Sequence, residues 1–317
     1  MNKNKIYLIV FAVLLLLYLA NKFMFNAAPE KNVDMQVLEM DTASIASIKV
    51  HQSKKNIDLQ LNKKNGKWSI SDKQKEYDAD ANVVKNVLTS LANLSIENIA
   101  ATDANKWKEF QLTDSLGTEV QIFDNEGKMI KDLIIGKFNY KPNPRSNNPY
   151  GGRNNIQGST YVRLTDSDYS YLVKGFLSMT FSQGVDNYRN KNLSKMKREK
   201  IQKVSFNYPA DSGFVLQKVD SVAWMIGKDT ANQKKVDSFL RTLSNYRESR
   251  FEKDFKATEQ ALFDIQVESS SAPLEISVYP KDSLNYVVHS NQNEAYFSVR
   301  KTSLEGRLLK KIKDFSN

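Results

Sequence analysis

The sequence predicts an α+β protein: an N-terminal transmembrane helix followed by two divergent repeats, each a mainly antiparallel sheet with packed helices. Three observations predict this class. Residues 6–20 carry no charge, the apolar positions after residue 44 change between a period of two and a helical period, and this order of periods recurs in the second half. A chain of 317 residues with 40% hydrophobic residues can also fill the cores of two ordinary domains.

The first repeat is predicted over residues 44–184. Three short strands are expected where every second residue is apolar, in SIKVHQ, NIDLQLNKK and GKWSIS. A helix follows, because the next apolar residues have helical spacing; they are Val84, Val87, Leu88, Leu91 and Leu94. Strand alternation then returns in TEVQIFDNEGKMIKDLIIGK around a turn at NEG.

The second repeat is predicted over residues 200–317, after a polar joint at 185–199. KIQKVSFNY corresponds to SIASIKVHQ, and the strand of Trp224 corresponds to the strand of Trp68. A second helical stripe is formed by Val236, Phe239, Leu240 and Leu243. We interpret both tryptophans as core anchors, with ligand stacking as the alternative.

The N-terminus indicates export and anchoring. Lys3 and Lys5 precede an apolar segment that, taken over 6–25, is about as long as a helix that crosses a bilayer. The basic residues favour a cytoplasmic N-terminus, so residues 26–43 are expected to form a stalk and the rest to be periplasmic, on a single-pass inner-membrane protein. A cleaved signal peptide is the alternative, although Asn26 stands where a small residue is preferred.

Composition argues against several functional classes. The chain has no cysteine and only two histidines, His51 and His289, which removes thiolate chemistry and means that a histidine-based metal site would have to use both imidazoles. The net charge is +10, but lysines and acids are interspersed, as on a solvated surface, so no nucleic-acid partner is expected. No enzyme motif is present. We therefore expect no catalytic activity, no cofactor and no metal.

The acidic pair Asp78 and Asp80 precedes the first predicted helix and has two interpretations. Paired carboxylates can form an acid–base or metal site, whereas a single carboxylate at this position can cap a helix by accepting hydrogen bonds from backbone N–H groups. In the second repeat, Asp229 is retained and Thr230 is aligned with Asp80. Because the second repeat could not build a carboxylate pair, we favour capping.

The longest difference between the repeats is an insert at 138–159, for which the second repeat has only PKDSL. It is rich in proline, glycine and asparagine and is predicted to be a long loop. Aromatic and guanidinium groups are enriched in interfaces. The candidate partner-binding residues here are Tyr140, Arg145, Tyr150 and Arg153. A loop without a function is the alternative.

Two further segments are candidates for contacts. The joint contains Tyr188, Arg189 and Lys191, which we assign to partner binding, with a structural linker as the alternative. Near the C-terminus, an apolar stripe faces basic residues; it consists of Leu304, Leu308, Leu309 and Ile312. Such a stripe can lie on a membrane, but we expect it to pack on its own repeat.

Several of these segments together resemble a family of bacterial envelope proteins with a tandemly repeated domain of unknown function. They are the apolar N-terminus, IASIKV, GKWSI, DADANVVKNVLTSLANL, FQL, LIIGK, TYVRL and NYRNKNL. Members are often encoded beside ABC transporters of the gliding-motility type. The resemblance implies an accessory protein of an ABC-type transporter or another envelope complex. The alternative is a periplasmic protein that binds a ligand or glycan in a cleft between the repeats.

Overall fold

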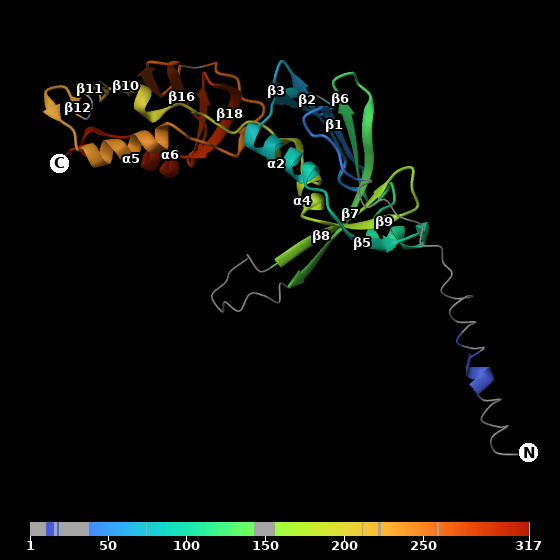
Figure 1. Cartoon of the computed structure of the whole chain (residues 1–317). Coiled ribbons are helices and arrows are strands. Elements are labelled where there is room, and N and C mark those ends of the chain that lie inside the picture. Colours follow the sequence, from blue (N-terminus) through green and yellow to red (C-terminus); the bar gives the residue numbers. More distant parts are fainter. Residues whose placement is uncertain are drawn as a thin grey trace, which may run out of the picture.

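The structure, a computed structural model, describes residues 11–15, 18, 38–73, 75–142, 156–210, 212–220, 223–258 and 260–316. Most of the predicted membrane segment, 6–25, lies outside these ranges; residues 11–15 and 18 are helical. Over the described ranges, no helix has both the length and the apolar character needed to span a bilayer. The described part from residue 38 onward folds into two sheet domains (Figure 1).

The first sheet has nine strands in the order β4-β3-β2-β1-β6-β7-β8-β9-β5, with every neighbouring pair antiparallel. Its strands are β1 (Ile45–Gln52), β2 (Ile57–Lys64), β3 (Lys67–Ser71), β4 (Glu76–Asp78), β5 (Ile96–Ala101), β6 (Thr118–Asp124), β7 (Met129–Pro142), β8 (Ile156–Leu164) and β9 (Ser170–Lys174). Its helices are α2 (Ala81–Ala92), α3 (Trp107–Phe110) and α4 (Leu177–Phe181), with 3-10 turns η2 (Ser53–Lys55), η3 (Ala104–Lys106) and η5 (Val185–Asn187).

The second sheet repeats this order as β13-β12-β11-β10-β15-β16-β17-β18-β14. Its strands are β10 (Ile201–Asn207), β11 (Phe214–Lys218), β12 (Trp224–Ile226), β13 (Asp229–Thr230), β14 (Phe251–Glu252), β15 (Phe263–Ser269), β16 (Leu274–Pro280), β17 (Asn285–Ser290) and β18 (Asn293–Arg300). Its helices are α5 (Gln233–Leu243) and α6 (Lys301–Arg307), with 3-10 turns η6 (Arg198–Lys200) and η7 (Ile312–Asp314). The matching strand orders confirm the predicted duplication.

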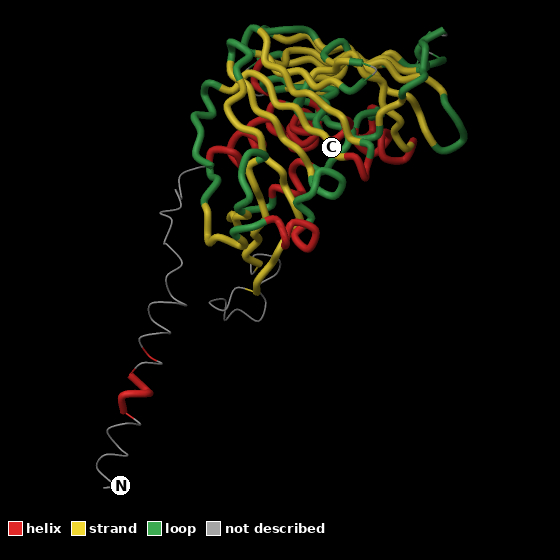
Figure 2. Tube along the Cα trace, turned by 90° about the vertical axis from the view of Figure 1, so that its right-hand side faces the viewer, coloured by secondary structure: helices red, strands yellow, loops and turns green. Residues whose placement is uncertain are grey.

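Each repeat packs one long helix against its sheet, and both helices lie on the same side of the molecule (Figures 1 and 2). In α2 the buried residues are Val84, Val87 and Leu91, and in α5 they are Val236, Phe239, Leu240 and Leu243. Both sets keep the helical spacing that the sequence predicted, because burying one apolar stripe is what stabilises such a helix against a sheet. Two large separate cores result, one in each repeat.

The capping prediction for Asp80 is confirmed, but its predicted counterpart was wrong by two residues. The Asp80 carboxylate accepts hydrogen bonds from the N–H groups of Asn82 and Val83. In the second repeat the cap of α5 is Asn232, not Thr230. The backbone N–H of Asp80 donates to Tyr188 and that of Asn232 donates to Phe315, so these pairs are equivalent.

The tryptophans and the C-terminal stripe pack largely as predicted. Trp224 is buried and Trp68 is half-buried against its core. Leu304, Leu308 and Leu309 are buried in the second core. Ile312 is the exception, because its side chain is 50% exposed.

The insert was predicted as a long loop, but its described parts are strands. β7 continues to Pro142 and β8 begins at Ile156, and their register pairs Phe138 with Thr160 and Tyr140 with Gly158. The two strands form a ribbon that projects from the first repeat (Figure 1). The alternation was hidden because prolines, glycines and asparagines interrupt it.

The repeat boundaries differ somewhat from the sequence prediction. Leu38, assigned to the stalk, is buried in the first core, as is Tyr188. Leu193 is buried in the second core. The predicted joint is therefore divided between the two repeats, and only about four residues, 189–192, connect one core to the other.

Candidate functional site

The connection between the repeats is an extended segment bonded to both sides. On the first repeat, the N–H of Asn190 donates to the carbonyl of Asp78 at 2.7 Å, next to a bridge between Ala79 and Arg189. On the second repeat, the N–H of Glu248 donates to the carbonyl of Lys191 at 3.0 Å. The segment therefore acts as a short shared strand, and its backbone is satisfied by both repeats.

Arg189 is the central side chain of this joint. Its guanidinium carbon lies 3.9 Å from the ring centroid of Tyr77 in the first repeat and 3.7 Å from that of Phe251 in the second. Asp186 accepts a hydrogen bond from the same guanidinium at 3.0 Å. The planar guanidinium has two flat faces, each of which can stack on an aromatic ring. Arg189 therefore joins one aromatic ring from each repeat.

An ion pair between Asp80 and Arg247 links the repeats a second time. The Asp80 side chain is buried and that of Arg247 is partly exposed. The helix cap Asp80 corresponds to Asn232, the cap of α5 in the second repeat. Arg247 lies fifteen residues after Asn232, so its equivalent in the first repeat is Ser95, fifteen residues after Asp80. Neither Ser95 nor Asn232 carries a charge, so the repeated fold itself does not require an ion pair at these positions. The pair of Asp80 and Arg247 is specific to the contact between the two repeats.

The pKa of Asp80 reflects this position. Burial alone would raise the pKa, but the hydrogen bond and charge of Arg247, with the N–H groups of Asn82 and Val83, outweigh it and hold the pKa below its usual value. Burial also raises the pKa of Tyr188, whose hydroxyl donates to the carbonyl of Thr180 at 2.6 Å. Both groups are thus held in one protonation state at neutral pH.

A cleft of about 500 Å³ opens beside the joint. It is lined by both repeats, with aromatic side chains, amides and charges of both signs: Lys75, Tyr77, Asp78, Arg189, Asn190, Glu252, Lys253, Asp254, Phe255, Asn293, Glu294, Ala295 and Tyr296. Tyr296 belongs to an aromatic cluster, since its ring packs 5.1 Å from Phe255 and 4.6 Å from His289. The cleft size is within the ~300–1,000 Å³ that small-molecule sites occupy.

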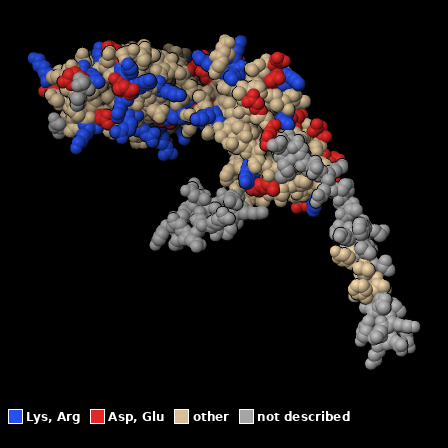
Figure 3. Space-filling view, viewed as in Figure 1, with Lys and Arg blue, Asp and Glu red and all other residues tan. Residues whose placement is uncertain are grey.

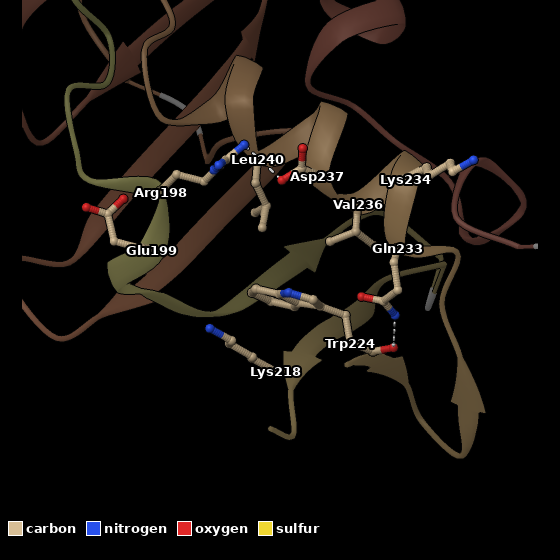
Figure 4. Close-up of a pocket in the computed structure, with 9 residues that line it drawn as sticks. All are labelled: Arg198, Glu199, Lys218, Trp224, Gln233, Lys234, Val236, Asp237 and Leu240. Carbon is tan, nitrogen blue, oxygen red and sulfur yellow. Dashed lines mark hydrogen bonds and ion pairs between the residues drawn. The ribbon is translucent and has the colours of Figure 1, made fainter. Parts of the chain in front are cut away.

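A second kind of groove occurs once in each repeat, between the tryptophan strand and the long helix. In the second repeat it is about 470 Å³ and is formed by Trp224, Val236 and Leu240 under a charged rim (Figure 4). At that rim Arg198 and Asp237 form an ion pair of 2.8 Å. The first-repeat groove, formed by Trp68, Val84 and Leu88, has a rim with a single charged residue, Lys85. The apolar floor thus follows from the shared fold, while the rims differ.

The projecting ribbon and the start of α4 together carry an exposed apolar surface, here called the aromatic patch and defined as Phe138 and Tyr140 of β7 with Phe176 and Met179 of the α4 segment. Phe138 stacks on Phe176 at 5.1 Å and on Tyr140 at 6.3 Å, while Tyr140 is 64% exposed. Gly158 makes this stacking possible, because a Cβ there would lie 2.6 Å from the ring of Phe176 and 2.7 Å from that of Phe138.

The aromatic patch has no counterpart in the second repeat. Helix α4 aligns with residues 304–308, at the end of α6, and the equivalents of Phe176 and Met179 are Ser303 and Gly306. The buried residues of the two helices match, since Leu177 and Leu304 are both covered. The core therefore does not require the exposed apolar residues of α4.

The structure places the predicted site residues in three different environments. Tyr140 is exposed on the ribbon, whereas Arg145, Tyr150 and Arg153 lie outside the described residues. Tyr188 and Arg189 are buried in the joint. Lys191 is half-buried, and its carbonyl bonds to Glu248. Sequence reasoning missed Phe176 and Met179, although their mismatch with Ser303 and Gly306 was a detectable signal.

No cluster of three or more acidic or histidine side chains suitable for a metal ion occurs among the residues that the structure describes. Asp78 and Asp80 do not form a carboxylate pair with a shared role. Asp80 caps α2 and binds Arg247, whereas Asp78 is exposed in the cleft.

Comparison with known families agrees with the duplication. The model of a domain of unknown function, DUF4340, matches the chain twice, over residues 14–115 and 99–265. The chain belongs to the DUF4340 family. Two matches are consistent with a repeated domain, although their ends do not coincide with the ends of the two sheets. A search of curated proteins gives no match.

The lowered pKa of Asp80 predicts a pH dependence for the stability of this DUF4340 protein. The carboxylate is stabilised in the folded state, so its contribution is complete above about pH 4–5 and is lost as pH falls through the folded pKa. Asn can replace Asp as a helix cap, as Asn232 does, but cannot pair with Arg247. Asp80→Asn should therefore lower the free energy of unfolding at pH 7 by about 1–3 kcal/mol.

Urea denaturation at a series of pH values checks this. The difference between the wild type and Asp80→Asn should shrink as the pH falls below about 4, the ordinary pKa of an aspartate, and should vanish once Asp80 is protonated in the folded state as well. Asp78→Asn, an exposed neighbour, serves as the control and should follow the wild type. A constant difference between the wild type and Asp80→Asn across the pH range would contradict the assignment.

Proposed function

We propose that this protein is a membrane-anchored, periplasmic interaction protein that has no catalytic role and serves as an accessory of an envelope complex. The observation that carries the proposal is the aromatic patch formed by the projecting ribbon and α4. Tyr140, Phe176 and Met179 are 64%, 46% and 53% exposed. They come from two elements, since Tyr140 is on β7 of the ribbon while Phe176 and Met179 belong to the start of α4, and Phe138 stacks between Tyr140 and Phe176. Exposed apolar surfaces of this kind mark contacts with other macromolecules.

The anchor and the partner class rest on other observations. The apolar segment 6–25 with Lys3 and Lys5 supports a single inner-membrane span with the N-terminus in the cytoplasm. The resemblance to envelope proteins encoded beside gliding-motility-type ABC transporters supports an ABC-type transporter subunit as the partner. Strand pairing between β7 and β8 and the contacts of the joint hold the described surfaces in place, which lowers the ordering cost of a contact there.

Site-specific photo-crosslinking tests the proposal. A photoreactive phenylalanine analogue in place of Tyr140 should crosslink in native membranes to a subunit of an ABC-type complex identified by mass spectrometry. The matched control is the same analogue at Leu284, which is 72% exposed in the β16–β17 turn, the equivalent connection in the second repeat. No adduct at Tyr140, or the same adducts from both positions, would contradict the proposal.

The inter-repeat cleft favours a second candidate function, the binding of a glycan. Sugar rings stack on aromatic side chains and their hydroxyls bond to amides and carboxylates, and Tyr296, Asn190 and Glu294 bring these groups together. Such a protein would still be non-catalytic, and its cleft would hold an envelope glycan beside the joint.

Saturation-transfer NMR with an N-acetylglucosamine oligomer distinguishes this second function. Transfer to the oligomer should be observed with the wild type and lost in Tyr296→Ala, while Tyr140→Ala, which removes an aromatic ring from the ribbon, should retain it. Absence of transfer from the wild type, or equal transfer from both variants, would count against a glycan site in the cleft.

A further inference from the structure

We propose that the helical face of the second repeat lies on the surface of an anionic phospholipid bilayer. We call this surface the basic face and define it by the exposed cations Lys234, Lys235, Arg241, Arg307, Lys311 and Lys313. The inference deepens the proposed function, because it assumes the predicted membrane anchor.

The charges of equivalent segments in the two repeats can be compared, which shows whether the fold requires the cations. Residues 229–241 and 301–314 of the second repeat carry eight cations and four acids, a formal charge of +4. The equivalent residues of the first repeat, 77–89 and 174–187, carry two cations and three acids, a formal charge of −1. Since the two sets occupy the same positions in the same fold, the fold itself does not require the cations.

Several of these cations are not neutralised locally. In the described part of the chain, no carboxylate lies within ion-pair distance of Lys234, Lys311 or Lys313. Arg241 shares Asp237 with Arg198. Figure 3 shows Lys and Arg gathered along the lower side of the second repeat, where Figure 1 places α5 and α6. Clustered basic residues are attracted to anionic lipid within about a Debye length.

The apolar residue Ile312 favours a lipid surface over a purely polar partner. It is 50% exposed and lies between Lys311 and Lys313, whereas the rest of its stripe is buried. An apolar side chain flanked by lysines is the pattern of residues that insert at the boundary between headgroups and acyl chains.

The geometry of the chain allows this contact. Residues 26–37 separate the predicted span from the first core, and twelve residues reach at most about 40 Å. The joint fixes the second repeat to the first, and the basic face and the ribbon lie on the same side of the molecule (Figure 1). Binding of the basic face would therefore hold the aromatic patch close to the bilayer, within reach of a membrane-embedded partner.

Lysine acetylation of the full-length protein in nanodiscs tests the inference. The rates at Lys234, Lys311 and Lys313 are measured by mass spectrometry in phosphatidylglycerol and in phosphatidylcholine discs. In about 0.1 M salt they should be at least about threefold slower in the anionic discs, and about 1 M salt should remove the difference. The exposed control residues Lys64 and Lys67, which end β2 and begin β3, should react equally in both discs.

A triple variant, Lys234→Gln with Lys311→Gln and Lys313→Gln, should lose the lipid dependence at Lys235, whereas the same changes at Lys63, Lys64 and Lys67 should leave it. Equal wild-type rates in both lipids, with the chain recovered in the disc fraction, would overturn this inference and leave the anchor standing. Recovery of the chain outside the disc fraction would contradict the anchor as well, so the two failures are distinguishable.

Discussion

The stacking of Arg189 between Tyr77 and Phe251 is the interaction on which the arrangement of this protein depends. Each repeat has its own core, and only residues 189–192 connect them. Without a fixed joint, the two sheets would be independent bodies on a short linker. The buried guanidinium, with the ion pair between Asp80 and Arg247, sets one relative orientation. The cleft exists because of that orientation, since both repeats supply its walls.

Duplication followed by surface divergence explains the rest of the molecule. The buried positions of the two repeats correspond closely, as Leu177 and Leu304 or Val84 and Val236 do. The exposed positions differ in kind. Phe176 and Met179 of the first repeat correspond to Ser303 and Gly306 of the second, and Lys311 and Lys313 of the second correspond to Gly184 and Asp186 of the first. Core positions are constrained by packing, while surface positions are free to acquire separate contacts. The two repeats are thus one scaffold with two different faces.

The sequence was sufficient for the duplication and for most of the regular elements, but not for the ribbon or for the contacts between the repeats. Alternation and helical spacing located β1 to β3, α2 and α5, since burying one face imposes those periods. The ribbon was missed because prolines and glycines broke its alternation. The role of Arg189 could not be found, because its two partners, Tyr77 and Phe251, are distant in sequence and only the folded chain brings them together. Thr230 was aligned with Asp80 by similarity of the surrounding residues. The backbone hydrogen bonds of Asp80 and Asn232 show instead that Asn232, two residues later, is the equivalent of Asp80.

The most direct test of this account is the distance between the repeats in solution. The chain has no cysteine, so spin labels at Lys85→Cys on α2 and Ser238→Cys on α5 can be introduced without other changes. Pulsed electron–electron double resonance on the full-length protein should give one narrow distance distribution, and Arg189→Ala should broaden it. A broad or multimodal distribution in the labelled protein with Arg189 intact would contradict a fixed joint and, with it, the common side on which the ribbon and the basic face are presented.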